Sequence, residues 1–142
     1  MKAAADIQSQ TTSNPASISQ KAALAALTVP DPAWEGRMLA AFAARRKLVK
    51  DRLNRIPGVE CLDPEGAFYV FPRIEGWFGR SVGGVEIQTS DDFARVCLEQ
   101  GHVALMPGSA FGADGYIRIS YATSEKVLEE SMDRLERLFK SA

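Results

Sequence analysis

The stretch Tyr116-Ile117-Arg118-Ile119-Ser120-Tyr121-Ala122 predicts a β-strand that is buried on one face. Alternation places Ile117, Ile119 and Tyr121 on the core face and Arg118 on the opposite face. A guanidinium beside a core needs an anionic partner, because burying an unpaired charge is very costly. Its planar fork of donors also suits a carboxylate. Arg118 is therefore a candidate either for a structural ion pair with a local Asp or Glu, or for binding a carboxylate ligand.

Composition and charge exclude several classes of partner. The chain has 142 residues, 46% of them hydrophobic and 25% charged, which is ordinary for one soluble globular domain. A net charge of −1 gives no electrostatic basis for binding nucleic acid or a membrane, and we expect neither partner. The start lacks the apolar segment of a signal peptide, and no apolar run reaches membrane-spanning length.

The cysteine and histidine content argues against a metal centre. Cys61 and Cys97 are far apart in sequence and show no C-x-x-C spacing, so we expect two reduced thiols in a cytoplasmic protein. The single histidine, His102, has no second histidine or acid at ligand spacing. We therefore expect no bound metal.

Capping and turn residues divide the chain into predicted elements. Helices are expected to begin at Asn14-Pro15, Asp31-Pro32, Thr89-Ser90 and Ser124. Strands are expected over residues 59–62, 67–71, 102–106 and 116–122, the first two forming a hairpin. We expect residues 1–13 to be irregular and the glycine-rich segment 76–84 to be a mobile surface loop. The result is a two-layer α+β fold, a mostly antiparallel sheet with helices on its Ile117 face and an open Arg118 face.

Four motifs in a fixed order carry a family resemblance. They are residues 8–20 (QSQTTSNPASISQ), 66–72 (GAFYVFP), 103–112 (VALMPGSAFG) and the arginine strand with the following Ala122-Thr123-Ser124. Together they resemble the C-terminal third of class I aminotransferases, which are fold-type-I pyridoxal-phosphate enzymes, and most closely the bacterial aspartate aminotransferase branch. The resemblance covers the chain from Ile7 onward. It implies a small C-terminal domain over residues 31–142, with residues 1–30 belonging to a missing large domain or an interface.

The resemblance also implies roles for individual residues. Arg118 would bind the α-carboxylate of amino acid and 2-oxo acid substrates, with aspartate and 2-oxoglutarate as the expected pair. Phe68 matches an aromatic residue near the substrate, although it could equally be a core residue of the hairpin. Ser13 and Asn14 match a segment that approaches the active site across a homodimer interface, although Asn14 also fits a helix N-cap. Trp34 and Phe42 are candidates for a surface that meets a missing partner.

The family's cofactor chemistry needs a lysine in a Ser-Lys motif. None of the six lysines stands in such a motif; they are Lys2, Lys21, Lys47, Lys50, Lys126 and Lys140. We therefore expect the cofactor domain to be absent, pyridoxal 5′-phosphate to bind only to the full-length enzyme, and this chain alone to be inactive, with no catalytic or cofactor-binding residue. The alternative is a stand-alone α/β ligand-binding or interaction module without catalytic activity.

Overall fold

The computed structural model describes residues 1–29 and 31–140. Two compact units can be distinguished, Met1–Arg37 and the part of the chain from Met38 onward. The assignment of residues 1–30 and 31–142 to different domains of a larger enzyme stays a prediction.

The first unit consists of exposed helices. Helix α1 spans Lys2–Thr11 and α2 spans Ser17–Thr28, and neither has a buried residue. The expectation of an irregular start was wrong, because the run of three alanines after Lys2 has a high helix propensity. The expected cap at Asn14 was also wrong. Ala16 is extended, at φ −55° and ψ 141°, so α2 begins only at Ser17.

Helix α3 spans Pro32–Leu53 and begins as predicted. The Asp31 carboxylate accepts a hydrogen bond from the Trp34 backbone N–H at 3.0 Å, which is the expected N-cap contact. Towards its C-terminal end, Val49 and Leu53 are buried. Trp34 is exposed, but Phe42 is not a free surface residue, because it packs edge to face on Tyr121 at 6.2 Å. Tertiary contact thus overrides the sequence expectation for Phe42.

A three-stranded antiparallel sheet lies at the centre of the second unit. Its strand order is β1 (Tyr69–Val70), β5 (Ile117–Ser120) and β4 (Met106–Pro107). Ile117 and Ile119 are buried, whereas Arg118 is half-buried and Ser120 is exposed. The alternation predicted from the sequence is confirmed.

Strand pairing differs from the prediction in two places. Residues 59–62 do not form a hairpin with residues 67–71; a single bridge joins Glu60 to Arg73, and β1 pairs with β5 instead. The strand expected from His102 is reduced to Met106–Pro107. His102 has a left-handed backbone, at φ 52°, which interrupts an extended chain.

The glycine-rich segment is ordered rather than a surface loop. It contains the 3₁₀ turn Glu75–Trp77 and the hairpin of β2 (Arg80–Val82) and β3 (Val85–Ile87). The two residues between these strands, Gly83 and Gly84, both have positive φ, as a type I′ hairpin turn requires. Trp77 anchors the segment, since only 2% of its surface is exposed.

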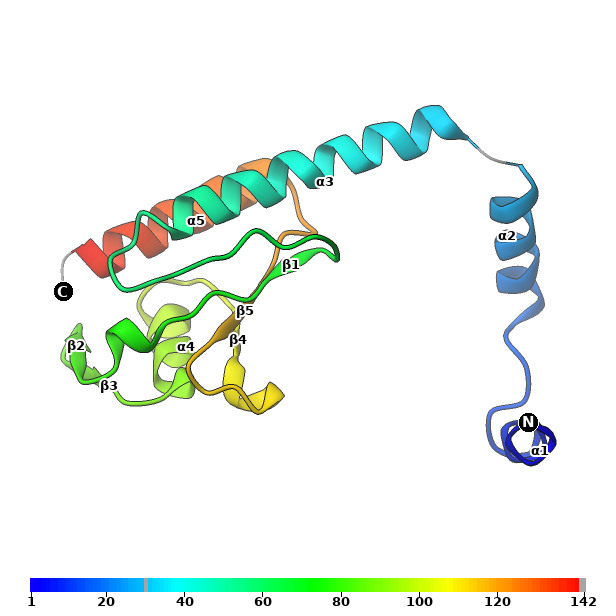
Figure 1. Cartoon of the computed structure of the whole chain (residues 1–142), viewed down its shortest axis with the longest axis horizontal. Helices are drawn as coiled ribbons and strands as arrows, with labels where there is room; N and C mark the ends of the chain where they lie inside the picture. Colours follow the sequence, from blue (N-terminus) through cyan, green and yellow to red (C-terminus); the bar gives the residue numbers. More distant parts are fainter. Residues whose placement is uncertain (30, 141–142) are drawn as a thin grey trace. The chain divides into compact units, whose positions relative to one another are not determined.

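The remaining helices complete a single hydrophobic core. Helix α4 spans Ser90–Glu99 and starts with the predicted capping box between Thr89 and Asp92. Helix α5 spans Glu125–Lys140 and lies beside the C-terminal part of α3, on one side of the strands (Figure 1). The core includes Phe93, Val96, Leu128, Met132 and Leu135 from these helices. The fold is α+β, as predicted.

Candidate functional site

Arg118 occupies the middle of the sheet. It lies on β5, the central strand, opposite Met106 of β4, while the other edge of β5 pairs with β1. Because strand residues alternate between faces, the buried Ile117 and Ile119 direct Arg118 away from the core. The strand therefore presents a half-buried guanidinium on the open face of the sheet.

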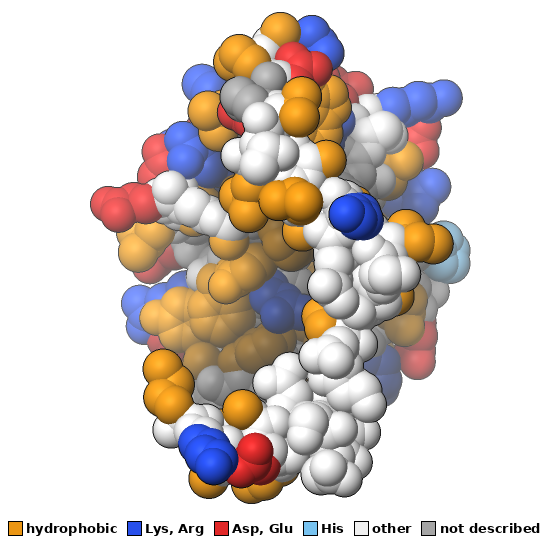
Figure 2. Space-filling model, turned by 90° about the vertical axis from the view of Figure 1, so that its right-hand side faces the viewer, with side chains coloured by type: hydrophobic (Ala, Val, Ile, Leu, Met, Phe, Trp, Pro, Cys, Tyr) orange, Lys and Arg blue, Asp and Glu red, His pale blue; other side chains and the backbone are white. Residues whose placement is uncertain are grey.

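Aromatic rings surround this guanidinium. Its Cζ lies 4.5 Å from the centroid of the Phe111 ring and 5.5 Å from that of Tyr69. Phe71 meets Phe111 edge to face at 5.9 Å and stacks on Tyr116 at 5.2 Å. A cavity of about 370 Å³ is lined by Tyr69, Phe71, Phe111 and Arg118, and we call it the Arg118 cavity. It combines one cation with apolar walls; Figure 2 shows one face of the molecule on which hydrophobic side chains gather with basic side chains among them.

The guanidinium of Arg118 has free donors. No hydrogen bond or ion pair joins it to any other residue in the described part of the chain. The aromatic faces offset part of the cost of a half-buried cation, by about 0.5–1 kcal/mol each at exposed sites. They leave the five N–H donors of a guanidinium largely unsatisfied. Of the two alternatives raised by the sequence, the local ion pair is not formed, and the donors are open to an external carboxylate.

Two larger concavities differ from the Arg118 cavity in their electrostatics. Each has a volume of about 440 Å³. At one, Arg134 donates to the His102 carbonyl at 3.2 Å. At the other, Arg46 and Lys50 lie 3.6 and 3.2 Å from the Asp63 carboxylate. These cations already have acceptors, so the Arg118 cavity is the better candidate for an anionic ligand.

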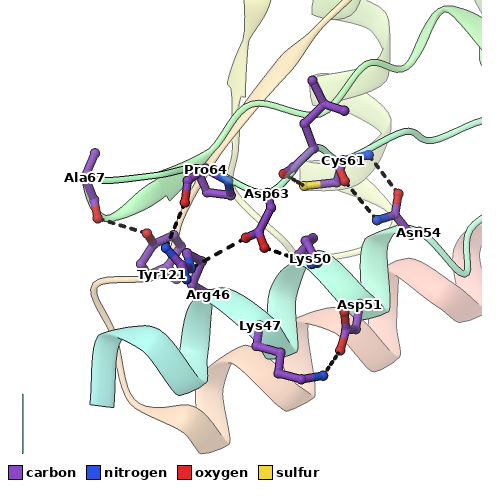
Figure 3. A network of polar contacts seen from close by, with 11 residues as sticks. Arg46, Lys47, Lys50, Asp51, Asn54, Cys61, Asp63, Pro64, Ala67 and Tyr121 are labelled. Carbon is purple, nitrogen blue, oxygen red and sulfur yellow. Dashed lines mark hydrogen bonds and ion pairs between the residues drawn. The ribbon is translucent and has the colours of Figure 1, made fainter. Parts of the chain in front are cut away.

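A polar network fixes the loop that leads into β1 (Figure 3). The Asn54 side chain exchanges two hydrogen bonds with the Cys61 backbone, at 2.8 and 2.9 Å. Arg46 donates to the Pro64 carbonyl at 2.9 Å, and the Tyr121 hydroxyl donates to the Ala67 carbonyl at 2.9 Å. Side chains of helix α3, of Asn54 directly after it and of Tyr121, the residue after β5, thus hold in place a loop that is not part of a β-sheet.

This loop holds Ala67 in an unfavourable conformation. Ala67 has φ 63°, a left-handed value that costs an L-residue with a Cβ about 1–2 kcal/mol. Burial of the Tyr121 ring raises the pKa of its hydroxyl, so this group stays protonated and able to donate to the Ala67 carbonyl. Tyr121 therefore stabilises a strained residue directly before Phe68.

Phe68 lies beside the Arg118 cavity but does not line it. Phe68 is 55% exposed, and its ring meets Tyr69 edge to face at 6.1 Å. Its carbonyl accepts hydrogen bonds from the Tyr121 N–H at 2.8 Å and from the Ser120 hydroxyl at 3.3 Å. The alternative of a core residue in a hairpin is wrong, because that hairpin does not form and the ring is not buried.

Ser13 and Asn14 both lie in the first unit. Ser13 has φ 57° and its backbone N–H donates to the Gln8 carbonyl at 2.9 Å. Asn14 is exposed and precedes the extended Ala16. Their role near a substrate stays a prediction.

Other reactive groups lie away from this cavity. Both cysteines are free and buried, and burial raises the pKa of the Cys61 thiol to about 11 and also raises that of Cys97. Within the described residues, no group of three His, Cys, Asp or Glu side chains is placed to hold a metal ion. A search of the same residues finds no helix that is both long and apolar enough to cross a membrane.

Sequence reasoning did not single out three residues that line the cavity. Tyr69 of β1 and Phe71, which directly follows β1, are two residues apart; in an extended chain this spacing shows that they share a face but not that this face meets Arg118. Phe111 lies in the 3₁₀ turn Gly108–Phe111, where no periodicity indicates the direction of a side chain. Only the pairing of β1 with β5 and the path of this turn bring the three rings to Arg118.

Comparison with known proteins gives consistent matches over nearly the whole chain. The family model for aminotransferase class I and II matches residues 1–135. The aspartate aminotransferase of Rhizobium meliloti (strain 1021) is 48% identical over 136 residues, which cover 95% of this chain and 33% of that protein. The aspartate/prephenate aminotransferase of Cereibacter sphaeroides (strain ATCC 17029 / ATH 2.4.9) is 47% identical over 137 residues, which cover 96% and 34%.

Solved structures agree with these matches. The aspartate aminotransferase from Rhizobium meliloti matches with a TM-score of 0.90 and 46% identity, over 98% of this chain and 35% of that one. The aromatic aminotransferase from Pyrococcus horikoshii OT3 matches with a TM-score of 0.80 and 40% identity, over 96% and 35%. The chain thus spans about a third of the length of its relatives. This favours the aminotransferase interpretation over a stand-alone module, and the chain belongs to the aminotransferase class I and II family.

Proposed function

We propose that this chain is the part of a pyridoxal-phosphate-dependent aminotransferase that binds the α-carboxylate of the substrate, through Arg118. The observation that carries the proposal is the half-buried guanidinium, which lies over the rings of Phe111 and Tyr69 and has no hydrogen-bond or ion-pair partner among the described residues. Two parallel hydrogen bonds from such a fork fix both the position and the orientation of a carboxylate. Fixing the carboxylate also fixes the neighbouring Cα–H bond, which is catalysis by orientation.

Arg118 would serve both halves of a transamination. An amino acid and a 2-oxo acid share the carboxylate next to the reacting carbon, so one arginine can bind both. Aspartate with 2-oxoglutarate is the proposed pair, since relatives at 48% and 41% identity are aspartate aminotransferases. Arg118 itself defines the substrate only as an α-amino or 2-oxo acid.

Phe68, Ser13 and Asn14 are proposed as further substrate contacts. The exposed ring of Phe68 next to Tyr69 supports a contact at the edge of the cavity. Exposure of Ser13 and Asn14 leaves both free to meet a second protomer. We propose that the full-length enzyme is a cytoplasmic homodimer.

The residues that line the Arg118 cavity do not fit a site for pyridoxal 5′-phosphate. No lysine lines the Arg118 cavity. Lys47 and Lys50 are paired with Asp51 and Asp63, and Lys140 lies near Glu136. We assign no step involving this cofactor to this chain, and propose that it binds to residues that these 142 do not include, so that the chain alone has no transaminase activity.

A chimeric enzyme tests the proposal. This chain replaces the matching third of the Rhizobium meliloti aspartate aminotransferase, and steady-state kinetics are measured for Arg118→Lys. A charge-assisted hydrogen bond is worth about 1.5–3 kcal/mol, so kcat/KM for both aspartate and 2-oxoglutarate is expected to fall about tenfold or more. Arg80→Lys is the matched control, because Arg80 also lies over an aromatic ring, that of Trp77 at 5.3 Å. An unchanged kcat/KM in a folded Arg118→Lys chimera would refute the assignment.

A further inference from the structure

Ser90, the first residue of α4, is a buried polar residue with no role in the site described above. Its exposed fraction is 0%. A buried hydroxyl must find hydrogen-bond partners, because an unpaired one costs free energy. The partners of Ser90 therefore indicate what this residue does.

Three hydrogen bonds connect Ser90 of α4 to the segment between β4 and β5. The Ser90 hydroxyl donates to Asp114 Oδ1 at 2.7 Å, and the Ser90 backbone N–H donates to the same oxygen at 2.9 Å. The Ser90 hydroxyl oxygen accepts from the Ser109 backbone N–H at 3.1 Å. Ser90 thus binds both ends of a short segment that contains Phe111.

Helix capping does not account for the two contacts of the Ser90 hydroxyl. The N-cap of α4 is Thr89, whose side chain accepts from the Asp92 N–H while the Asp92 carboxylate accepts from the Thr89 N–H. This capping box satisfies the start of the helix without the Ser90 hydroxyl. The Ser90 hydroxyl is therefore available for contacts with the turn between Ser109 and Asp114.

The turn between Ser109 and Asp114 has little freedom to readjust. The Gly108 N–H donates to the Tyr116 carbonyl at 2.8 Å, and the Ala113 N–H donates to the Gly108 carbonyl at 2.9 Å. A Cβ at Gly108 would lie only 2.0 Å from the Ala113 carbonyl oxygen, so the backbone is closely packed here. A displacement of Ser109 or of Asp114 is therefore transmitted to Phe111, which lies between them in the sequence.

We propose that Ser90 is a positioning residue for the Arg118 cavity, acting through the turn that carries Phe111. By holding Ser109 and Asp114, Ser90 places the Phe111 ring against the Arg118 guanidinium, at 4.5 Å from Cζ. Ser90 is not among the residues that line the cavity. Its effect on carboxylate binding rests on the proposed function, whereas its effect on the geometry of Phe111 and Arg118 does not.

The test compares side-chain variants by NMR on the ¹⁵N-labelled chain. The Nε–Hε signal of Arg118 reports its position over the Phe111 ring through the ring current. In Ser90→Ala and in Asp114→Ala this signal should move towards the position of an arginine without an aromatic neighbour. The double variant should move it at least as far as either single variant, because Ser90→Ala leaves the bond from the Ser90 N–H to Asp114 and Asp114→Ala leaves the bond from the Ser109 N–H to the Ser90 hydroxyl. Asp114→Asn keeps the accepting oxygen and should preserve the signal.

A second readout is the affinity of the chain for succinate, used as a dicarboxylate probe. We expect Ser90→Ala to weaken the affinity for succinate about threefold or more. The matched control is Ser131→Ala, which removes a hydroxyl that donates to the Val127 carbonyl at 2.7 Å within α5. This variant should change neither the Arg118 signal nor the succinate affinity.

The outcomes separate the two proposals. An unchanged Arg118 signal in folded Ser90→Ala overturns the positioning role. If Ser90→Ala does not fold, the comparison of Asp114→Ala with Asp114→Asn decides, and equal signals in these two variants overturn it as well. A wild-type chain that does not bind succinate counts against the carboxylate site, while the signal shift still tests Ser90.

Discussion

The Cζ atom of Arg118 lies 4.5 Å from the centroid of the Phe111 ring, although Arg118 belongs to β5 and Phe111 to the preceding 3₁₀ turn. A ring in this position holds a cation without neutralising it. The quadrupole of the ring favours the charge, yet the ring offers no acceptor to the N–H donors. The arginine is consequently oriented and still available, which is what a binding site for a carboxylate requires.

Replacing Phe111 by leucine should weaken carboxylate binding with little effect on stability. Phe111 is 45% exposed, so little buried surface is lost, whereas the cation–π contact disappears. Such a contact is worth about 0.5–1 kcal/mol at exposed sites, which corresponds to a loss in succinate affinity of roughly two- to fivefold. Calorimetric titration of the chain measures it. Trp34→Leu, an exposed aromatic that does not line the cavity, is the control; an equal loss there would show a nonspecific effect.

Tyr121→Phe should destabilise the chain by removing one hydrogen bond. The variant keeps the ring packed against Phe42 but loses the bond from the hydroxyl to the Ala67 carbonyl. A net cost of about 0.5–1.5 kcal/mol in the free energy of unfolding is expected, measured by urea denaturation. Tyr116→Phe is the matched control, because the Tyr116 hydroxyl makes no hydrogen bond within the described part of the chain. Equal stabilities of the two variants would contradict the role given to Tyr121.

The ion pair between Arg52 and Glu136 should make stability depend on pH. The hydrogen bond from Arg52 at 2.5 Å is the main cause of the lowered pKa of Glu136 in the folded chain. A carboxylate with a lowered folded pKa adds stability above its unfolded pKa of 4.5, and that stability is lost as the pH falls through the folded value. Glu136 is 14% exposed, so solvent screening is limited.

Glu136→Gln should therefore lower the free energy of unfolding at neutral pH by about 1.5–3 kcal/mol. The difference from wild type should shrink once the pH falls below 4.5, because the wild-type carboxyl group is then being neutralised. Urea denaturation across this pH range measures both. Glu130→Gln, at an exposed position of the same helix, is the control. A difference that stays constant with pH would rule out the ion pair as its source.

The apolar side chains of the first unit should promote self-association. Ile18, Leu27 and Val29 are 83, 85 and 72% exposed, and α2 buries no residue. Exposed apolar surface favours association because its removal from water is favourable. Sedimentation velocity should show a mass that rises with concentration, and Leu27→Lys should shift it towards the monomer. Leu62→Lys, at a leucine that is 88% exposed in the second unit, should not. A monomer at all concentrations would contradict this prediction.

Local sequence signals were sufficient where the relevant interactions are local. The alternation around Arg118 predicted which residues of β5 are buried, because a strand exposes successive side chains on opposite faces. The spacing of Thr89 and Asp92 predicted the start of α4, because a capping box joins residues within one turn. The same reasoning failed for Asn14 and for the start of α1, where propensity and capping favoured different boundaries.

Only the tertiary structure decided how distant segments meet. Nothing in the run from Ala67 to Phe71 distinguishes pairing with residues 59–62 from pairing with β5, because both partners offer the same backbone groups; packing of the core selected β5. The contacts of Phe111 and Tyr69 with Arg118 arise in the same way, as does the linkage of Ser90 to Asp114. Sequence by itself determined that Arg118 stands on an open face. The rings that hold it there depend on energies between residues far apart in the chain, which no local pattern encodes.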